Sequence, residues 1–222
     1  MSNLVSHIHS NLTIADAAFL LRFDKTFEFK AGQTISIAIN DGDIPRLYSI
    51  ASPPGAPYFE IIFKIKDGGY NTPQMAQLKP SDAIYVDGPF GNFIGTDEPA
   101  WYIATGTGVA PFHSMLYSIE TNNKVLLHGV RSITELHFFA EFKHLLGDSY
   151  IPVISGGDVA NNEISGRVTD VIKRCYTGEL KYNWNENTKF FLCGNPRMVF
   201  DVNKLLLELG IHRKNILTES YL

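Results

Sequence analysis

Apolar and polar residues alternate along much of the chain from Leu4 to Val86. An apolar residue at every second position is typical of strands that bury one face in a core. Clusters of Gly, Pro, Asn and Asp interrupt the alternation at 31–33, 40–42, 53–55 and 67–69. Many short strands joined by tight turns predict a closed or nearly closed antiparallel β-barrel.

The pattern changes after residues 95–99. A continuous apolar run at 101–104 is followed by a glycine-rich turn and a helix-like stretch that continues to Glu120. The same order recurs three times, with apolar runs at 125–127, 151–154 and 190–192 and helical stretches at 135–146, 168–174 and 199–209. This alternation predicts a Rossmann-like α/β domain with a parallel sheet. We therefore expect two domains, at 1–97 and 98–222.

The charge, the lengths of the apolar runs and the cysteine content argue against several classes of binding partner. The 222 residues carry a net charge of −4, so we expect no basic surface for nucleic acid or an anionic membrane. No apolar run approaches the roughly 20 residues of a membrane helix, and a cytoplasmic protein is expected. Cys175 and Cys193 are the two cysteines, which is too few for a disulfide framework or a zinc or iron–sulfur centre, so no metal is expected.

Three short segments are candidates for binding. The loop 105–111 follows the first strand of the second domain, where glycines let backbone N–H groups approach a pyrophosphate; the alternative is a plain tight turn. The turn 68–72 precedes a short helical stretch and offers similar donors, or only a turn and a helix cap. On a strand at 46–49, Arg46 and Tyr48 point to one side, and Ser49 points to the other side or along the edge. Taken alone, Tyr48 is a core aromatic and Arg46 a surface charge.

Five motifs stand in the order that is typical of the ferredoxin–NADP reductase superfamily, and they extend over nearly the whole chain. They are Arg46-x-Tyr48-Ser49, Gly68-Gly69-x-x-Thr72, Gly88-Pro89-Phe90-Gly91, Gly106-Thr107-Gly108-Val109-Ala110-Pro111 and Cys193-Gly194-Asn195-Pro196. The chain resembles this superfamily, which implies an FAD-binding barrel at 1–97 and an NAD(P)-binding domain at 98–222.

The resemblance implies roles for residues of the barrel. Tyr48 would pack on the flavin ring, Arg46 would meet the flavin pyrophosphate, and Ser49 would hydrogen-bond near flavin N5. Gly69 and Thr72 would meet the FAD phosphates, and the strand at 62–64 would border the ring with its backbone. The further FAD contacts implied are Leu47, Phe63, Lys64, Tyr70, Asn71 and Tyr221.

The resemblance also implies a nucleotide site. The pyrophosphate would lie on Thr105, Gly106, Thr107, Gly108 and Pro111. Cys193 and Gly194 fall where the family brings the nicotinamide over the flavin, although Cys193 is equally consistent with a small buried hydrophobe. Ser49, Cys193 and Glu219 are the candidate catalytic residues, as positioners of the reacting groups.

The choice between NADP and NAD depends on cations near the ribose 2′-phosphate. Arg131, Ser155 and Arg167 stand at family positions for that phosphate, but Gly156 replaces the arginine that follows the serine. NADP is favoured, with NAD as the alternative. The tail resembles the Glu-x-Tyr-Trp ending of bacterial members, with Leu222 in place of Trp and Tyr221 as a candidate lid over FAD.

We expect a reductase that exchanges hydride between NADPH and FAD, and single electrons with a separate ferredoxin or flavodoxin, as a monomer. The alternative in the same architecture is an NAD(P)H-dependent flavin reductase or the electron-transfer component of an oxygenase. A non-enzymatic nucleotide-binding module is a third hypothesis, because a fold alone does not fix function. Two histidines receive structural interpretations: His113 as a helix-surface residue, and His128 as the end of a buried strand.

Overall fold

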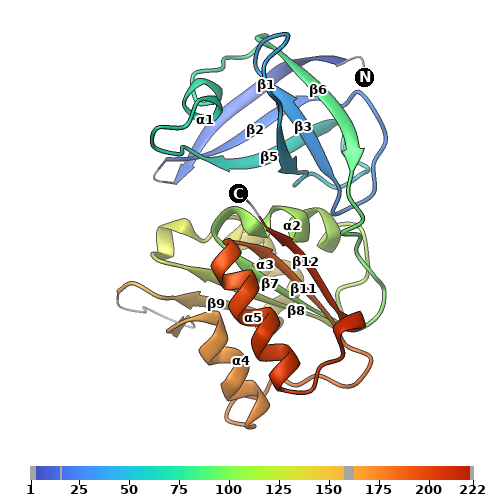
Figure 1. Cartoon of the computed structure of the whole chain (residues 1–222), viewed down its shortest axis with the longest axis vertical. Helices are drawn as coiled ribbons and strands as arrows, with labels where there is room; N and C mark the ends of the chain where they lie inside the picture. The colour runs from blue at the N-terminus through green and yellow to red at the C-terminus, as the bar shows by residue number, and fades with distance from the viewer. Residues whose placement is uncertain (1–3, 16, 158–162, 221–222) are drawn as a thin grey trace. The chain divides into compact units, whose positions relative to one another are not determined.

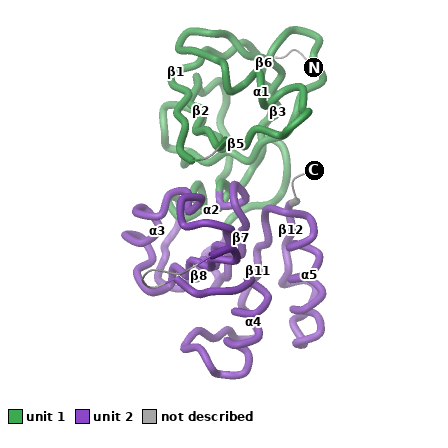
Figure 2. The backbone as a smooth tube through the Cα atoms, turned by 90° about the vertical axis from the view of Figure 1, so that its left-hand side faces the viewer, with its two compact units in different colours: residues 1–95, 110–118 green, residues 96–109, 119–222 purple. Residues whose placement is uncertain are grey.

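The computed structural model describes residues 4–15, 17–157 and 163–220. The chain forms two compact units, one comprising Met1–Gly95 with Ala110–Ser118 and the other Thr96–Val109 with Ile119–Leu222 (Figure 2). The expected division into domains at 97 and 98 stays a prediction. No helix in these described ranges is both long and apolar enough to cross a membrane.

The first unit is an antiparallel six-stranded sheet in the order β4-β3-β6-β1-β2-β5 (Figure 1). Two short helices accompany it, α1 at Asn71–Met75 and α2 at Ala110–Leu116. The predicted barrel domain is thereby confirmed. Its strands are β1 Leu4–Ala15, β2 Ala18–Asp24, β3 Thr34–Ala38, β4 Arg46–Ser49, β5 Tyr58–Lys64 and β6 Ala83–Phe90.

Hydrogen bonds beyond the end of β4 join the two edges of this sheet. The Ala51 amide donates to Glu60 O over 2.7 Å, and the Glu60 amide donates to the Ser52 hydroxyl over 3.1 Å. Inside, the aromatic ring of Phe59 contacts three other phenylalanines at centroid distances of 4.7 to 5.6 Å, namely Phe23, Phe27 and Phe29. Phe23 and Phe59 belong to β2 and β5, whereas Phe27 and Phe29 come from the segment that follows β2.

The second unit is a parallel six-stranded sheet in the order β10-β9-β8-β7-β11-β12 (Figure 1). The predicted α/β architecture is thereby confirmed. Its strands are β7 Ala100–Thr105, β8 Lys124–Val130, β9 Tyr150–Ile154, β10 Ile164–Ser165, β11 Lys189–Gly194 and β12 Ile216–Ser220. Its helices are α3 Phe139–Leu146, α4 Val168–Tyr176 and α5 Pro196–Glu208, with short 3₁₀ turns at Gly106–Val109, Ile133–Glu135, Gly147–Ser149 and Arg213–Asn215.

The two faces of the parallel sheet bury different helices. Trp101 and Ile103 of β7 pack in one cluster with apolar residues of α4 and α5. On β9, the ring of Tyr150 contacts Phe142 of α3 at 5.5 Å between centroids. In a parallel sheet the carboxyl ends of all strands lie at one edge, so the loops after β7, β8, β9 and β11 gather there.

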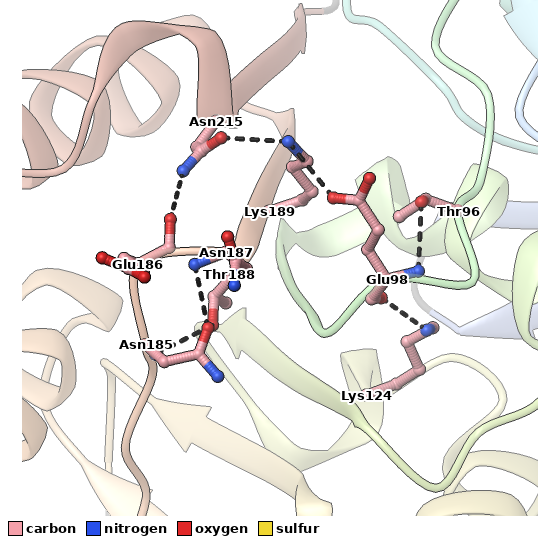
Figure 3. Close-up of polar contacts among 9 residues, drawn as sticks. All are labelled: Thr96, Glu98, Lys124, Asn185, Glu186, Asn187, Thr188, Lys189 and Asn215. Carbon is pink, nitrogen blue, oxygen red and sulfur yellow. Dashed lines mark hydrogen bonds and ion pairs between the residues drawn. The ribbon is translucent and has the colours of Figure 1, made fainter.

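A polar cluster closes the opposite edge, at the amino ends of the strands (Figure 3). The Lys189 ammonium donates to Asn215 Oδ1 over 3.0 Å and lies 3.2 Å from a carboxylate oxygen of Glu98. The Asn215 amide group donates to Glu186 O over 2.8 Å. Lys124 is 1% exposed, and its ammonium donates to Glu98 O over 2.7 Å. These bonds satisfy polar groups that burial would otherwise leave unpaired.

Replacing Asn215 by alanine is expected to lower the free energy of unfolding by about 2 kcal/mol, because Glu186 O and the Lys189 ammonium each lose a partner. Both tryptophans, Trp101 and Trp184, lie in the second unit, so urea denaturation followed by tryptophan fluorescence reports on it. Asn187→Ala is the matched control, since that side chain is exposed. Equal midpoints for the two variants would contradict the assigned role of Asn215.

Candidate functional site

Strand β4 presents the candidate flavin residues on two faces. Arg46 and Tyr48 are paired with Ile37 and Ile35 of β3 and lie on one face, as expected. Arg46 is exposed and Tyr48 is half-buried. Leu47, on the other face, is 61% exposed, whereas Ser49 is buried. The strand therefore offers a guanidinium and an aromatic ring on the same side.

The Tyr48 phenol is held in its neutral form. Its hydroxyl donates to the sulfur of Met75 over 3.1 Å. Burial raises the pKa of Tyr48 to about 12, against the opposing effect of the Arg46 charge. A neutral ring packed against α1 is a fixed apolar surface, which suits stacking on a planar ring system such as a flavin.

The candidate phosphate turn is closed by its own residues. The Gly69 amide donates to Lys66 O over 2.8 Å, and the Thr72 hydroxyl accepts the Lys66 amide over 2.9 Å. A Cβ on Gly69 would lie 2.9 Å from Lys66 O, so the turn fits only glycine without a shift. The Asn71 side chain donates to Ile44 O over 3.4 Å, and Tyr70 is 64% exposed. The Gly69 N–H is therefore occupied within the turn, whereas the Thr72 hydroxyl only accepts there and keeps its own proton for a phosphate oxygen.

The candidate FAD contacts on β5 differ in how far their side chains are buried. Ile62 and Phe63 are buried, and the Phe63 ring stacks on Phe19 at 5.3 Å between centroids. Lys64 is exposed. The side chains of Ile62 and Phe63 thus belong to the packing of the barrel, which leaves their backbone as the part that can border a flavin.

Two residues of α2 make contacts that the sequence did not predict. The expectation that His113 lies on the helix surface is wrong, because it is 7% exposed and its Nδ1 donates to Ala51 O over 2.8 Å. The fully buried Ser114 donates to Ser52 O over 2.7 Å. These carbonyls belong to the second and third residues after the end of β4, so α2 fixes the backbone that continues the candidate flavin strand. The motif places these residues after the loop 105–111 but gives no sign of their partners, 62 residues away.

The second unit contains a glycine cradle at the carboxyl ends of β7 and β11. A Cβ on Gly108 would lie 2.5 Å from both Cys193 O and Gly194 Cα. Gly194 has φ +128°, and a Cβ there would lie 2.5 Å from the Thr105 hydroxyl, which also accepts the Asn195 amide over 3.0 Å. The two loops approach each other so closely that only glycine fits at these positions. A backbone cradle of this kind fits a pyrophosphate.

The structure brings most of the nucleotide candidates to this edge. Cys193 is buried and is aligned with Glu219 of β12 across the sheet. Gly106 and Thr107 lie in the 3₁₀ turn directly after β7. Pro111 is buried in α2, which groups with the first unit. Tyr221 and Leu222, including the candidate lid, lie outside the described residues.

The candidates for the ribose 2′-phosphate also lie at the carboxyl ends of their strands. The amide of Ser155, after β9, donates to Val130 O over 2.9 Å, and the Gly156 amide donates to Arg131 O over 3.0 Å, after β8. Arg167 precedes α4, where its amide donates to the Asp170 carboxylate over 3.1 Å. Arg131 and Arg167 are both exposed. Two guanidinium groups are thus available beside a serine on one edge.

Comparisons with known proteins agree with this geometry. A family model described as an oxidoreductase FAD-binding domain matches residues 4–94, and one described as an oxidoreductase NAD-binding domain matches residues 102–204. Ferredoxin–NADP reductase B of Sorangium cellulosum is 31% identical over 212 residues, which cover 89% of this chain and 87% of that protein. The chain belongs to the ferredoxin–NADP reductase family. It is accordingly an FAD-dependent NAD(P)H oxidoreductase.

Other known proteins are similar to this chain as well. Flavodoxin/ferredoxin–NADP reductase of Escherichia coli is 30% identical, over 78% of this chain and 77% of that protein. The reductase component of a Pseudomonas phenol 2-monooxygenase is 27% identical, and the match covers 90% of this chain but 60% of that longer protein. A ferredoxin NADP+ reductase from Neisseria gonorrhoeae, solved with bound FAD and NADP, shares the fold at a TM-score of 0.87 and 24% identity, with 99% of both chains covered.

Proposed function

We propose that this protein exchanges hydride between NADPH and FAD and passes single electrons to or from a separate ferredoxin or flavodoxin. The observation that carries the proposal is the close approach of Gly108 to Cys193 and Gly194, which supports a pyrophosphate site at this loop in a chain that also matches an FAD-binding domain. Relatives named as ferredoxin or flavodoxin reductases support the choice of carrier.

When bound, FAD supplies the redox chemistry, and the protein supplies binding and orientation. Arg46 would neutralise charge on the flavin pyrophosphate, Gly69 and Thr72 would border its phosphates, and the Tyr48 ring would cover the isoalloxazine. Ser49 would hydrogen-bond near N5. The remaining barrel contacts proposed are Leu47, Phe63, Lys64, Tyr70 and Asn71, with Tyr221 as a lid.

On the nucleotide side, Thr105, Gly106, Thr107, Gly108 and Pro111 would hold the pyrophosphate. Cys193, Gly194 and Glu219 would orient the nicotinamide, with no covalent role for the thiol. Arg131, Ser155 and Arg167 would bind the 2′-phosphate. In this proposal the residues before the domain boundary near residue 98 bind FAD, and those after it, except the lid residue Tyr221, bind the nicotinamide nucleotide.

The test is the visible spectrum of the FAD-reconstituted protein, titrated anaerobically with NADPH and separately with NADH. NADPH is expected to bleach the flavin band at lower concentration, after which oxidised ferredoxin or flavodoxin restores it. A protein that cannot bind FAD would exclude the proposal. Bleaching by NADH at the same or lower concentration would exclude the preference for NADP.

The arginines allow a sharper test of the nucleotide preference. Arg131→Ala and Arg167→Ala are each expected to raise the KM for NADPH about tenfold, because charge-assisted hydrogen bonds to the 2′-phosphate are lost. The KM for NADH should not change, since NADH lacks that phosphate. Arg174→Ala is the control, because Arg174 lies on α4 and pairs with Glu179, which follows that helix. An equal rise in the KM values for NADH and NADPH would show that neither arginine binds the 2′-phosphate.

The second candidate function is the electron-transfer component of an oxygenase or a free-flavin reductase. The relative that reduces a phenol 2-monooxygenase supports it. Turnover with NADPH that reduces free FMN faster than ferredoxin or flavodoxin would favour a flavin reductase. Reduction of neither acceptor, with rapid bleaching of bound FAD, would favour a dedicated oxygenase partner.

A monomer and a cytoplasmic location complete the proposal. Light scattering coupled to gel filtration tests the first. Fractionation of the source cells tests the second.

A further inference from the structure

His128 lies under the candidate nucleotide loop. It is 0% exposed and belongs to the buried strand β8, although it does not end that strand, which continues to Val130. Its Nε2 is 3.2 Å from Gly106 O, and its Nδ1 is 3.2 Å from the Tyr150 hydroxyl of β9. A single imidazole therefore joins the central strands of the sheet to the first residue of the loop that follows β7.

The chemistry of the two partners fixes which nitrogen carries the proton. Burial lowers the pKa of His128 to about 3, with His137 adding to the effect, so the ring is neutral near pH 7. Gly106 O can only accept a hydrogen bond, so Nε2 must be the nitrogen that donates. Nδ1 is then the acceptor, and the Tyr150 hydroxyl donates to it. Burial also raises the pKa of Tyr150, which keeps the phenol protonated.

This hydrogen bond sets the direction of a peptide group. The peptide bond between Gly106 and Thr107 is trans, and in a trans peptide the C=O and N–H groups point in opposite directions. Because Gly106 O points toward His128 in the interior, the Thr107 N–H points away from it. Gly106 has φ +54°, and glycine adopts this region about as readily as the right-handed one, so side-chain sterics alone do not select it.

We propose that His128, oriented by Tyr150, is a positioning residue that turns the Thr107 N–H toward the pyrophosphate of the bound nicotinamide nucleotide. The inference rests on the proposed function, since it takes the nucleotide as the ligand of this loop. Outward N–H groups at a strand-to-helix loop are the donors that bind phosphate oxygens. Without the histidine, Gly106 O loses its partner in the interior and the peptide is held by the 3₁₀ turn alone, so the donor points toward the ligand for less of the time.

The experiment measures the Kd of FAD-loaded protein for NADP+ and for 2′-AMP by calorimetry. Because 2′-AMP has no pyrophosphate, it reports on the adenosine end alone. His128→Leu removes the donor and is expected to weaken NADP+ binding about tenfold while the Kd for 2′-AMP stays the same. His128→Gln places an amide N–H near the position of Nε2 and is expected to restore most of the affinity.

Two tyrosine variants provide a matched pair. Tyr150→Phe removes the hydroxyl that orients His128 and is expected to weaken NADP+ binding about threefold, or 0.65 kcal/mol. Tyr182→Phe removes a hydroxyl that donates to Asp148 O over 2.9 Å and should leave both Kd values unchanged. The flavin spectrum should be the same in all variants, because His128, Tyr150 and Tyr182 belong to the second unit.

The outcomes separate this inference from the proposed function. If the unmodified protein does not bind NADP+, the proposed function fails first. If it binds NADP+ and His128→Leu or Tyr150→Phe binds equally well, the positioning role is wrong. An equal loss for NADP+ and 2′-AMP would also overturn it, since that result indicates general damage. Nitrogen NMR of the ring provides an independent check, because a proton found on Nδ1 contradicts the assigned hydrogen bonds. Where His128→Leu does not fold, His128→Gln and Tyr150→Phe still decide the matter.

Discussion

Replacing Gly108 by alanine is expected to abolish binding of the nicotinamide nucleotide and to lower the free energy of unfolding of the second unit by about 3 kcal/mol. The added Cβ would lie 2.5 Å from Cys193 O, 2.5 Å from Gly194 Cα and 2.7 Å from the Cys193 carbonyl carbon. All three are backbone atoms, so no side-chain rotation can relieve the overlap. Overpacking of this kind costs about 1 to 3 kcal/mol or more.

The backbone of Cys193 and Gly194, which the added Cβ would overlap, cannot move away easily. Cys193 lies in β11, which is hydrogen-bonded to β7 on one side and to β12 on the other. The loop that carries Gly108 must therefore move outward, and with it the N–H groups proposed to bind the pyrophosphate. Urea denaturation by tryptophan fluorescence measures the loss of stability, and calorimetry with NADP+ measures the loss of binding.

Two glycine variants serve as controls for Gly108→Ala. A Cβ on Gly55 meets no atom within 4 Å, and Gly55 belongs to the first unit, so Gly55→Ala should change neither the stability of the second unit nor nucleotide binding. Gly106→Ala also has space, but its φ of +54° makes an L side chain cost about 1 kcal/mol. The expected order of destabilisation is Gly108, then Gly106, then Gly55. If Gly108→Ala behaves like Gly55→Ala, the cradle is not as tight as the structure indicates.

The sequence carries enough local information to predict both folds. The sequence alternation predicts that β4 and β5 are strands, and the RxYS strand appears where the pattern predicts it, although the middle of β5 is buried on both faces rather than on one. The apolar runs of β7, β8, β9 and β11 likewise predict strands buried on both faces. These signals are local because side-chain direction along a strand is fixed by the backbone.

What the sequence could not supply is the partner of a residue far away along the chain. All seven residues of α2 are buried, so the helix has no exposed face from which the direction of His113 could be read. Its partner, Ala51 O, is a backbone atom with no sequence signature. The glycine motif predicts that Gly108 has a special role, but only the structure identifies Cys193 and Gly194 as the atoms that exclude a side chain. The assignment of ligand roles to individual residues stays a prediction.

Acidification is expected to destabilise the second unit through His128. The pKa of this histidine is about 3 in the folded protein, against an ordinary value of 6.5, and burial is the main cause. Between these two values the unfolded chain binds a proton that the folded chain does not, so the stability that His128 contributes is complete above about pH 6.5 and is lost as the pH falls. The loss approaches 1.4 kcal/mol for each pH unit.

Lowering the pH from 6.5 to 4.5 should therefore remove about 2 to 3 kcal/mol of unfolding free energy in excess of what other groups contribute. His128→Gln isolates this excess, because glutamine does not titrate and the remaining groups are unchanged. Near His128, His137 opposes its protonation and Glu135 and Gly106 O favour it. Urea denaturation at half-unit steps from pH 7.5 to 4.5, followed by tryptophan fluorescence, gives the two curves. The plots of unfolding free energy against pH should run parallel above pH 6.5 and converge below it, because the unmodified protein loses stability faster than His128→Gln. Plots that stay parallel at every pH would show that the pKa of His128 in the folded protein is close to its ordinary value.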